Sequence, residues 1–286
     1  MICGINKKLC IIPAARQVIA EISNEFGEIS PIMIPFNGKS VILNILENTD
    51  YKEFDFLVIS YTNEKSTRYI KKLLRKYDNC KIIYLENSNS LAHTIIQSKK
   101  IIKQNNYEEI VINFGDTIIS NLNQIKGDII YYSIISSKHF NWTIFTIRNN
   151  LIELIKDKKS NIDGLDLNIF IGVFSISDPE LFLKTLEQAY QSKKDLDSFW
   201  ETIQNYYNKK NTVYIKPQAW HDFGHIDNYY KAKKNYFIAR SFNEVTLSQN
   251  QKYIIKTSKN SEKLKDEIEW FLKIPKDISY IAPKLI

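Results

Sequence analysis

Two aspartates lie in short motifs that could hold a metal ion beside a phosphate. Asp116 directly follows the apolar run "EEIVINFG", and Asp222 lies in "WHDFGHID", where Trp220 can anchor the turn and Gly224 gives the backbone freedom. Carboxylates are the hard oxygen ligands that Mg²⁺ takes, and the ion neutralises charge as a phosphoryl or nucleotidyl group is transferred. Considered alone, Asp116 could also cap a helical turn after it.

The same cluster holds two histidines, His221 and His225, four positions apart. A zinc site normally needs further Cys or His ligands, and no motif links His93 or His139 to the cluster. We therefore expect the two histidines to form hydrogen bonds around the site or to contact a phosphate, rather than to bind a metal.

The aspartates belong to a chain of alternating strands and helices. Near-continuous Ile, Val, Phe and Tyr content is typical of strands buried on both faces, and it occurs in "KLCIIPAA", "FDFLVIS", "CKIIYLE", "EEIVINFGD", "GDIIYYSII", "WTIFTI" and "IFIGVFSIS". Helical spacing occurs in "KSVILNILENT", "STRYIKKLLRKY", "LAHTIIQSKKIIKQ" and "DPELFLKTLEQAYQ". The alternation predicts an α/β fold with a Rossmann-like, mostly parallel mixed sheet flanked by helices. Asp116 would emerge at its carboxyl edge, where such folds bind ligands.

Composition restricts the class of protein. At 286 residues with 44% hydrophobic side chains, the chain predicts one large folded domain with an appendage. The net charge of +7 comes from 39 basic and 32 acidic residues that are mixed along the chain, which favours an anionic small substrate over a nucleic acid. Without an apolar signal segment or a run long enough to span a membrane, we expect a cytoplasmic protein. Three cysteines, Cys3, Cys10 and Cys80, have no paired spacing, and two of them lie in apolar strand-like stretches, where we expect buried free thiols.

A third motif lies near the start of the chain. An apolar strand ends in Pro13, Ala14 and Ala15, and the Asn-Gly turn of "IPFNGKSVI" leads into a helix. Small residues after a strand let backbone N–H groups approach a phosphate. With "INFGDTII" and "WHDFGHID" following in order, residues 8–235 resemble the sugar-1-phosphate nucleotidyltransferases, also called nucleoside-diphosphate-sugar pyrophosphorylases. That family has an apolar strand ending in Gly-Asp and a Trp-x-Asp-x-Gly turn.

The resemblance implies a reaction and a set of roles. An NTP and a sugar phosphate, or a related small phosphate, would give an NDP-linked product and pyrophosphate for capsule or other surface polysaccharide synthesis. Asp116 and Asp222 would hold Mg²⁺. The backbone of Ala14 and Ala15, together with Arg16, would bind the nucleotide phosphates. A homo-oligomer is compatible with this assignment.

Two further segments resemble the family's substrate contacts. "NSNSLAHTI" is similar to the loop that borders the nucleobase, which implies base contacts from Ser88 and Ser90; the same residues could cap the helix that follows. "LIELIKDK" and "FIGVFSIS" resemble the sugar-side hairpin and the next core strand. They imply that Lys158 reaches the acceptor phosphate and that Gly172 borders the substrate.

The sequence also departs from the family pattern. Arg16 stands where the first glycine of the phosphate loop is expected, and Ile32 stands in place of a phosphate-binding lysine. Both changes remove contacts to phosphate. Arg16 could supply the missing cation; alternatively, the site binds a different anion or has little catalytic power. The alternative function is a catalytically weak nucleotide-sugar binding or scaffolding domain of a bifunctional nucleotidyltransferase–kinase protein. A glycosyltransferase is disfavoured because no close pair of acids follows a strand.

The C-terminal segment has a different pattern. We expect residues 1–238 to form the nucleotidyltransferase-like domain and residues 239–286 a β-hairpin and a helix capped by Ser261. This segment resembles the opening of an aminoglycoside or choline phosphotransferase, with Lys256 on a strand and Glu267 or Glu269 on the helix as an ion pair. It would be either the start of a kinase-like domain or a cover for the main domain.

Overall fold

The chain folds into two compact units, residues 1–229 and residues 230–286. The computed structural model describes residues 8–49, 53–61, 64–120, 126–136, 141–157, 166–193, 198–233, 242–249, 253–275 and 285–286. The domain boundary predicted between 238 and 239 lies outside these residues and stays a prediction. Within the same residues, no helix has the length and apolar content needed to cross a bilayer.

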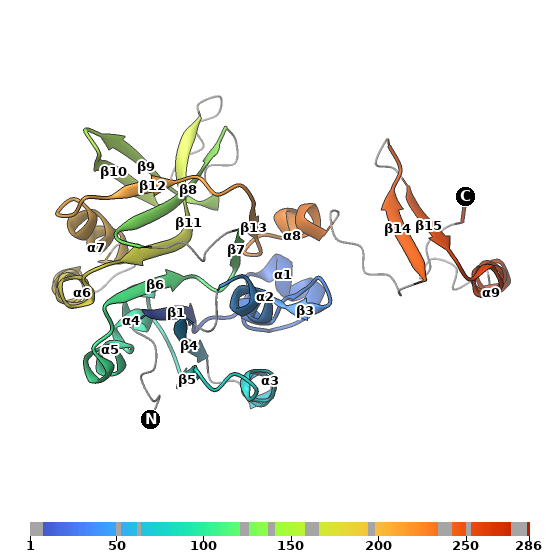
Figure 1. Cartoon of the computed structure of the whole chain (residues 1–286), viewed down its shortest axis with the longest axis horizontal. Coiled ribbons are helices and arrows are strands. Elements are labelled where there is room, and N and C mark those ends of the chain that lie inside the picture. Colours follow the sequence, from blue (N-terminus) through green and yellow to red (C-terminus); the bar gives the residue numbers. More distant parts are fainter. Residues whose placement is uncertain are drawn as a thin grey trace. The chain divides into compact units, whose positions relative to one another are not determined.

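A nine-stranded mixed sheet forms the centre of the larger unit (Figure 1). In spatial order its main path contains β10 (Leu151–Asp157), β9 (Thr143–Arg148), β11 (Leu167–Ile176), β6 (Glu109–Asn113), β1 (Lys8–Ala14), β4 (Phe54–Tyr61) and β5 (Cys80–Leu85). Off this path, β8 (Ile129–Ile135) pairs with β11 and β12 (Val213–Ile215) pairs with β8. Strands β6, β1, β4 and β5 run parallel, whereas β11 is antiparallel to β6. The predicted mostly parallel mixed sheet is confirmed.

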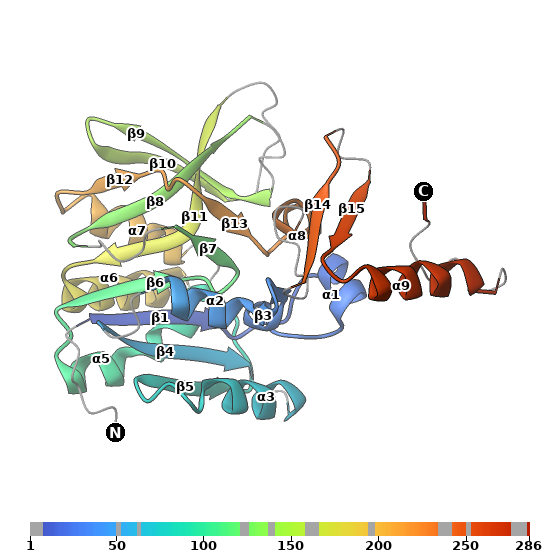
Figure 2. The same ribbon diagram turned by 45° about the vertical axis from the view of Figure 1, so that its right-hand side comes forward.

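Helices cover both faces of this sheet, which explains why its central strands are apolar on both sides (Figure 2). The helices up to this point of the chain are α1 (Ala20–Phe26), α2 (Val41–Asn48), α3 (Glu64–Leu74), α4 (Leu91–Ile96), α5 (Lys99–Asn105), α6 (Pro179–Lys193), α7 (Ser198–Tyr207) and α8 (Ile226–Lys233), with a 3₁₀ turn at Pro31–Met33. Leu9, Ile11 and Ile12 of β1 are fully buried in the core that results.

Local sequence signals explain how several of these elements begin and end. The Asn-Gly turn is confirmed: Asn37 and Gly38 have positive φ angles of 50° and 73° and join β2 (Pro35–Phe36) to β3 (Lys39–Ser40). The single helix predicted over "LAHTIIQSKKIIKQ" is wrong, because α4 and α5 are separate. Ser98 explains the break, since its hydroxyl and its N–H both donate hydrogen bonds to the Ile95 carbonyl.

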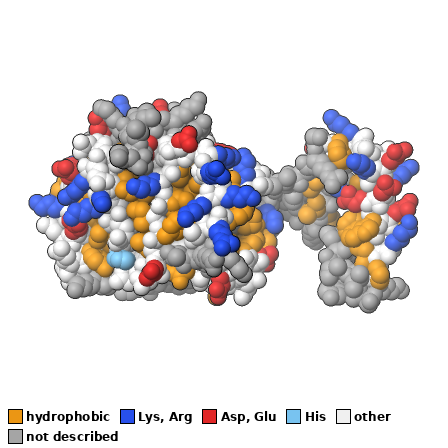
Figure 3. Space-filling view, turned by 90° about the horizontal axis from the view of Figure 1, so that it is seen from below, with side chains coloured by type: hydrophobic (Ala, Val, Ile, Leu, Met, Phe, Trp, Pro, Cys, Tyr) orange, Lys and Arg blue, Asp and Glu red, His pale blue; other side chains and the backbone are white. Residues whose placement is uncertain are grey.

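The surface of the larger unit carries both apolar and basic side chains on the face seen in Figure 3. The edge strand β5 is half-buried along most of its length.

Cys10 on β1 is buried and Cys80 on β5 is half-buried; both are free thiols, as predicted. Burial raises the pKa of the Cys80 thiol to about 12, so at neutral pH it stays protonated. Cys3 lies outside the described residues.

The smaller unit contains the predicted strand pair and helix. Strand β14 (Asn243–Leu247) runs antiparallel to β15 (Ile254–Ser258), and α9 spans Ser261–Lys273. The predicted cap was wrong by one residue, because the side chain of Asn260 accepts the hydrogen bond from the Lys263 N–H and Ser261 is already helical. Lys256 donates to Glu267 at 2.6 Å, whereas Glu269 pairs with Lys273. The kinase-like assignment stays a prediction.

Candidate functional site

A short strand pair brings the two aspartate motifs together. Strand β7 (Thr117–Ile119) runs antiparallel to β13 (Trp220–Asp222), with Asp222 opposite Thr117. The Phe223 N–H donates a hydrogen bond to the Asp116 backbone carbonyl at 2.8 Å, so the pairing continues for one residue beyond Asp222 and Thr117. Residues more than 100 positions apart in the sequence therefore lie side by side at the carboxyl end of β6.

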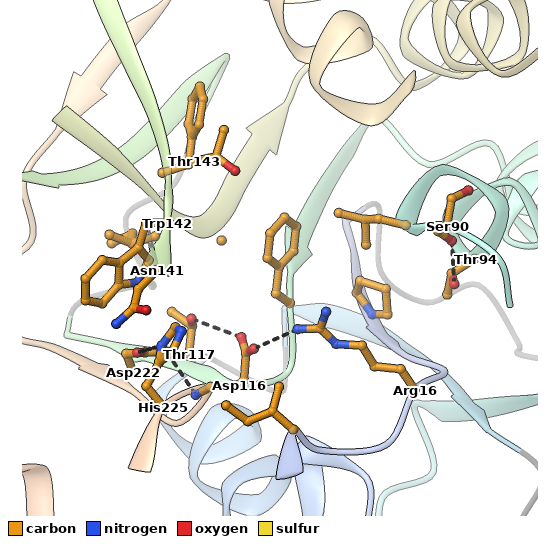
Figure 4. Close-up of a pocket in the computed structure, with 18 of the residues that line it drawn as sticks. Arg16, Ser90, Thr94, Asp116, Thr117, Asn141, Trp142, Thr143, Asp222 and His225 are labelled. Carbon is orange, nitrogen blue, oxygen red and sulfur yellow. Dashed lines mark hydrogen bonds and ion pairs between the residues drawn. The ribbon is translucent and has the colours of Figure 1, made fainter. Parts of the chain in front are cut away.

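Gly224 allows both carboxylates to approach one point. A Cβ atom at Gly224 would lie 3.1 Å from Asp222 Oδ1 and 3.2 Å from Asp116 Oδ2. Figure 4 shows the two side chains directed toward the same region of the site. A side chain at this position would crowd both carboxylates, so glycine leaves open the space that they share, whereas the backbone angle of Gly224 lies outside the positive-φ region and does not itself call for glycine.

The turn after β13 fixes the orientation of Asp222. Its Oδ1 accepts a hydrogen bond from the Gly224 N–H at 2.9 Å, and its Oδ2 accepts one from Asn228 Nδ2 and contacts His225 Nδ1, both at 2.7 Å. The prediction that a histidine of this cluster forms hydrogen bonds around the site is confirmed for His225. His221 lies on β13 near Phe36, and burial lowers its pKa.

Asp116 occupies an electrostatically costly position. Burial raises the pKa of its carboxyl, the Arg16 guanidinium lowers it, and the neighbouring charge of Asp222 raises it again, so that the result lies above the ordinary value. Arg16 Nη2 is 3.6 Å from Asp116 Oδ2. Two buried carboxylates that converge with one cation beside them favour the binding of a further positive charge.

These ligands match one kind of metal ion better than another. No cluster of three or more His, Cys, Asp or Glu side chains suited to a metal occurs in the described part of the chain, so a closed zinc site is not formed there. Mg²⁺ instead takes one or two carboxylates and completes its shell with water and substrate phosphates. Asp116 and Asp222, converging above Gly224, fit that pattern.

A cavity of about 360 Å³ opens beside the carboxylates. This is within the usual size range of small-ligand sites. It brings together most of the residues that the sequence predicted for the site: Ala15, Arg16, Ser88, Ser90, Asp116, Gly172 and Asp222 all line it. Ala14 is buried, and its carbonyl accepts a hydrogen bond from Ser30. Lys158 lies outside the described residues, so its predicted contact with the acceptor stays a prediction.

The serine loop both lines the cavity and caps a helix. Ser90 Oγ accepts a hydrogen bond from the His93 N–H at 3.0 Å, so Ser90 caps α4. Ser88 Oγ lies 2.5 Å from Thr94 Oγ1 and also donates to the Ser90 carbonyl. Of the two roles considered for these residues, the cap is therefore present, and it holds the loop at one side of the cavity in Figure 4.

Two glycines at the site have steric reasons to be glycine. At Gly172, φ is +81° and a Cβ atom would lie 2.7 Å from the Phe114 ring. At Gly115, φ is +79° and a Cβ atom would lie 2.8 Å from Ile32. Ile32 is fully buried in this contact, so it offers packing beneath Gly115 where a lysine would have offered charge.

Sequence reasoning missed the aromatic lining of the cavity. Its rings come from Phe114, Trp142, Phe170, Trp200, Trp220 and His225. Trp142 and Trp220 lie 6.0 Å apart between ring centroids, with 65° between their planes, and Trp142 lies 5.2 Å from His225 at 58°. Trp142 and Trp200 stand in unrelated segments without a shared spacing, so no local pattern could have grouped them.

Solved structures share this architecture at low sequence identity. No protein-family model matches the sequence, and no curated protein matches it closely enough to count as a relative. Apo UDP-glucose pyrophosphorylase matches with a TM-score of 0.60 and 14% identity, over 80% of this chain and 97% of that one. The nucleoside-diphosphate-sugar pyrophosphorylase from Vibrio cholerae gives 0.59 and 14%, over 79% and 99%. CTP:phosphocholine cytidylyltransferase from Streptococcus pneumoniae gives 0.59 and 13%, over 80% and 98%.

Each match covers nearly the whole of the solved protein and about four fifths of this chain. The mixed sheet flanked by helices is common to them. This chain therefore has the nucleotide-diphospho-sugar transferase fold that the ordered strand, Gly-Asp and Trp-x-Asp-x-Gly motifs predicted.

Proposed function

We propose that the protein is a Mg²⁺-dependent nucleotidyltransferase that joins an NTP to a sugar phosphate or a related small phosphate and releases pyrophosphate. The observation that carries this proposal is the convergence of Asp116 and Asp222 above Gly224, at the edge of a cavity that Arg16 also lines. Open α/β sheets bind their ligands at this carboxyl edge, and the fold is that of known nucleotidyltransferases.

The reaction needs alignment and charge more than proton transfer. An oxygen of the acceptor phosphate attacks the α-phosphorus of the NTP, a new P–O bond forms, and the bond to the bridging oxygen of the β-phosphate breaks, so pyrophosphate leaves. Because a phosphate monoester has a second pKa of about 6, the attacking oxygen is already anionic at neutral pH. The reaction therefore requires no general base.

The described side chains divide this work between them. Asp116 and Asp222 would hold Mg²⁺, which supplies charge neutralisation for the transferring phosphate when bound. Arg16, on the exposed side of Asp116, would contact the outgoing phosphates with the backbone at Ala15. The capped loop at Ser90 would border the base. In-line geometry is the main requirement, and these groups lie around a single cavity.

Two finer assignments extend this proposal. Lys158 would orient the acceptor phosphate. The product would serve capsule or other surface polysaccharide synthesis in the cytoplasm, as expected from the motifs.

The proposal is tested by measuring pyrophosphate release. The purified protein is incubated with Mg²⁺, each NTP and a panel of sugar phosphates and other phosphate monoesters. We expect release with at least one pair, its loss when EDTA replaces Mg²⁺, and its loss in Asp222→Asn. As a matched control, Asp266→Asn changes an acid on α9 in the smaller unit and should leave the rate unchanged. Release that persists in EDTA or in Asp222→Asn would contradict the assigned site.

One observation favours a second function. Ile32 is fully buried and brings no charge to the cavity. Among the described residues that line the cavity, Arg16 is then the one Lys or Arg side chain that could bind the phosphates. A site with weakened catalysis would serve as a nucleotide-sugar binding or scaffolding domain of a bifunctional nucleotidyltransferase–kinase protein. Nucleotide binding by calorimetry, without pyrophosphate from any acceptor, would favour this alternative.

A further inference from the structure

We propose that the outer face of α3 docks the protein onto a bilayer surface that carries anionic lipid headgroups. This basic face comprises five exposed cations at the end of α3 and in the turn that follows it: Arg68, Lys71, Lys72, Arg75 and Lys76. The inference goes beyond the proposed function, because it concerns the surface on which the protein binds and not the reaction in its cavity.

The amphipathic pattern of α3 turns these cations outward. Ile70 and Leu74 are buried, so one side of the helix packs into the core. At 3.6 residues per turn, the three cations within the helix fall inside an arc of about 100° on the side away from that packing. Figure 3 views the larger unit from the side of α3 and β5, and Lys and Arg side chains gather on this side.

The charge of this segment has one sign. Residues 68–76 contain five basic residues and no acid, and the nearest acids along the chain are Glu64 and Asp78. A cluster of four or more Lys and Arg residues on an amphipathic helix is typical of a surface that binds anionic lipid. Each cation held near such a membrane adds to the attraction, so the five act together.

Tyrosines lie among the cations. Tyr69 is 51% exposed, the Lys71 ammonium lies 5.3 Å from the ring centroid of Tyr84 on β5, and the Lys76 ammonium lies 5.2 Å from that of Tyr77. Tyrosine combines an apolar ring with a polar hydroxyl and is enriched where headgroups meet hydrocarbon. Tyr69 therefore suits the boundary region, while the neighbouring cations stay with the lipid phosphates.

Other anionic partners match this face less well. Cations on the outside of a helix point in diverging directions, whereas a site for one small anion needs donors that converge in a concavity. The cavity described above takes no lining residue from α3 or β5. Nucleic acid carries the matching charge, but base stacking needs open aromatic faces, and the rings of Tyr77 and Tyr84 each have an ammonium over them.

A second copy of the chain is also disfavoured. An isologous contact through the basic face would place the same cations of two copies against each other, and like charges oppose such a contact. A bilayer instead presents many anions over a wide area, which matches diverging cations.

Vesicle binding tests the inference on the whole chain. Co-sedimentation compares vesicles of phosphatidylcholine with vesicles that also contain about 30% phosphatidylglycerol, at about 0.1 M salt. We expect a partition coefficient at least about tenfold higher on the anionic vesicles, and loss of this preference at about 1 M salt. Equal binding to both vesicles would assign it to exposed apolar side chains such as Trp270 and Leu272. That result, or binding to neither vesicle, would overturn the inference.

Charge reversal locates the binding surface. Lys72→Glu/Arg75→Glu should lower the partition coefficient on anionic vesicles by at least about tenfold. Lys72→Ala/Arg75→Ala should lower it by a smaller factor, and alanine keeps the helix favourable, so this loss does not depend on unfolding. The matched control, Lys184→Glu/Lys209→Glu, makes the same change in net charge at exposed lysines of α6 and the turn after α7, and should have less than about a twofold effect. An equal loss in the control, or no loss in either variant at Lys72 and Arg75, would overturn the inference.

Competitors separate the bilayer from the other partners. Millimolar glycerol 1-phosphate should not displace the protein from anionic vesicles, because one headgroup meets few of the diverging cations. Displacement would indicate a discrete phosphate site, and displacement by a DNA duplex at a lower phosphate concentration than the lipid would indicate nucleic acid. A dimer that forms without vesicles and is lost in Lys72→Ala/Arg75→Ala would assign the face to a second copy. Each of these results would overturn the inference, and none of the measurements depends on pyrophosphate release.

Discussion

Arg16 Nη2 lies 3.6 Å from Asp116 Oδ2, and the two side chains differ sharply in exposure, at 67% for Arg16 and 13% for Asp116. The carboxylate is therefore fixed and buried, whereas the guanidinium reaches it from solvent. An exposed cation of this kind can turn toward a phosphate when a metal ion takes its place beside the carboxylate. We propose that Arg16 supplies the positive charge that a lysine at position 32 would have brought to the phosphates.

Replacing Arg16 should weaken nucleotide binding. We expect Arg16→Ala to raise the Kd of the preferred NTP by about tenfold or more, since a charge-assisted hydrogen bond to phosphate is lost, and Arg16→Lys to recover part of the loss. Calorimetric titration measures both. Arg148→Ala is the matched control, because Arg148 is also exposed and paired, with Glu153 at 3.4 Å, but does not line the cavity. An unchanged Kd in Arg16→Ala would show that the phosphates bind elsewhere.

Removing the carboxylate of Asp116 should lower activity without lowering the stability of the metal-free protein. Asp116→Asn is expected to lower pyrophosphate release by at least about 100-fold, because Mg²⁺ loses a charged ligand. Burial and the neighbouring charge of Asp222 raise the pKa of Asp116, so neutralising it removes an unfavourable interaction in the metal-free protein. We therefore expect the metal-free variant to have an equal or higher Tm by calorimetry. A lower Tm with unchanged activity would contradict both halves of this prediction.

The parts of the site that could be predicted are those encoded by short local patterns. The apolar run before Asp116 predicted a strand end, and the spacing of "WHDFGHID" predicted a turn with a carboxylate, because each signal depends on neighbours in the sequence. Both aspartates do line one cavity. The cap at Asn260 was missed by one residue because Asn and Ser both favour that position.

The parts that could not be predicted depend on distant contacts. The pairing of Asp222 with Thr117 is a register between strands about 100 residues apart, and no local pattern encodes it. The aromatic lining at Trp142 and Trp220 arises in the same way. Ile32 could be recognised as a lost charge, but its packing beneath Gly115 required the fold. Tertiary packing, rather than local propensity, decides these features.

Gly172 should be intolerant of alanine for two separable reasons. Its φ is +81°, which an L-residue adopts at a cost, and the new Cβ would lie 2.7 Å from the Phe114 ring. Gly127 is the matched control, because its φ is +94° but no atom would meet the added Cβ within 4 Å. We expect Gly172→Ala to lower the free energy of unfolding in urea by at least about 1 kcal/mol more than Gly127→Ala does, because the second variant bears backbone strain without the clash. Equal losses would mean that Phe114 moves aside freely.

The ionised carboxylate of Asp178 should stabilise the folded protein, and this stabilisation should be lost at low pH. Its Oδ1 accepts a hydrogen bond from the Leu181 N–H at 3.0 Å, which caps α6, and its Oδ2 accepts one from Lys210 at 2.9 Å. Desolvation opposes ionisation, but the Leu181 N–H and Lys210 outweigh it and lower the pKa of Asp178 below its ordinary value of 3.8. The folded protein then holds this proton less tightly than the unfolded chain does. The contribution is present above pH 3.8 and is lost as the pH falls through the lowered pKa.

Two substitutions at Asp178 test whether its ionised form stabilises the folded protein. Asp178→Ala should reduce the free energy of unfolding by about 1 kcal/mol at pH 7, because it removes the cap, whereas Asp178→Asn keeps an acceptor and should cost less. The difference between the wild type and Asp178→Asn, measured by urea unfolding, should shrink from pH 7 toward pH 3, because the wild-type carboxylate loses its charge and with it the attraction of Lys210. A difference that stays constant over this range would show that the ionised state of Asp178 contributes nothing beyond the cap itself.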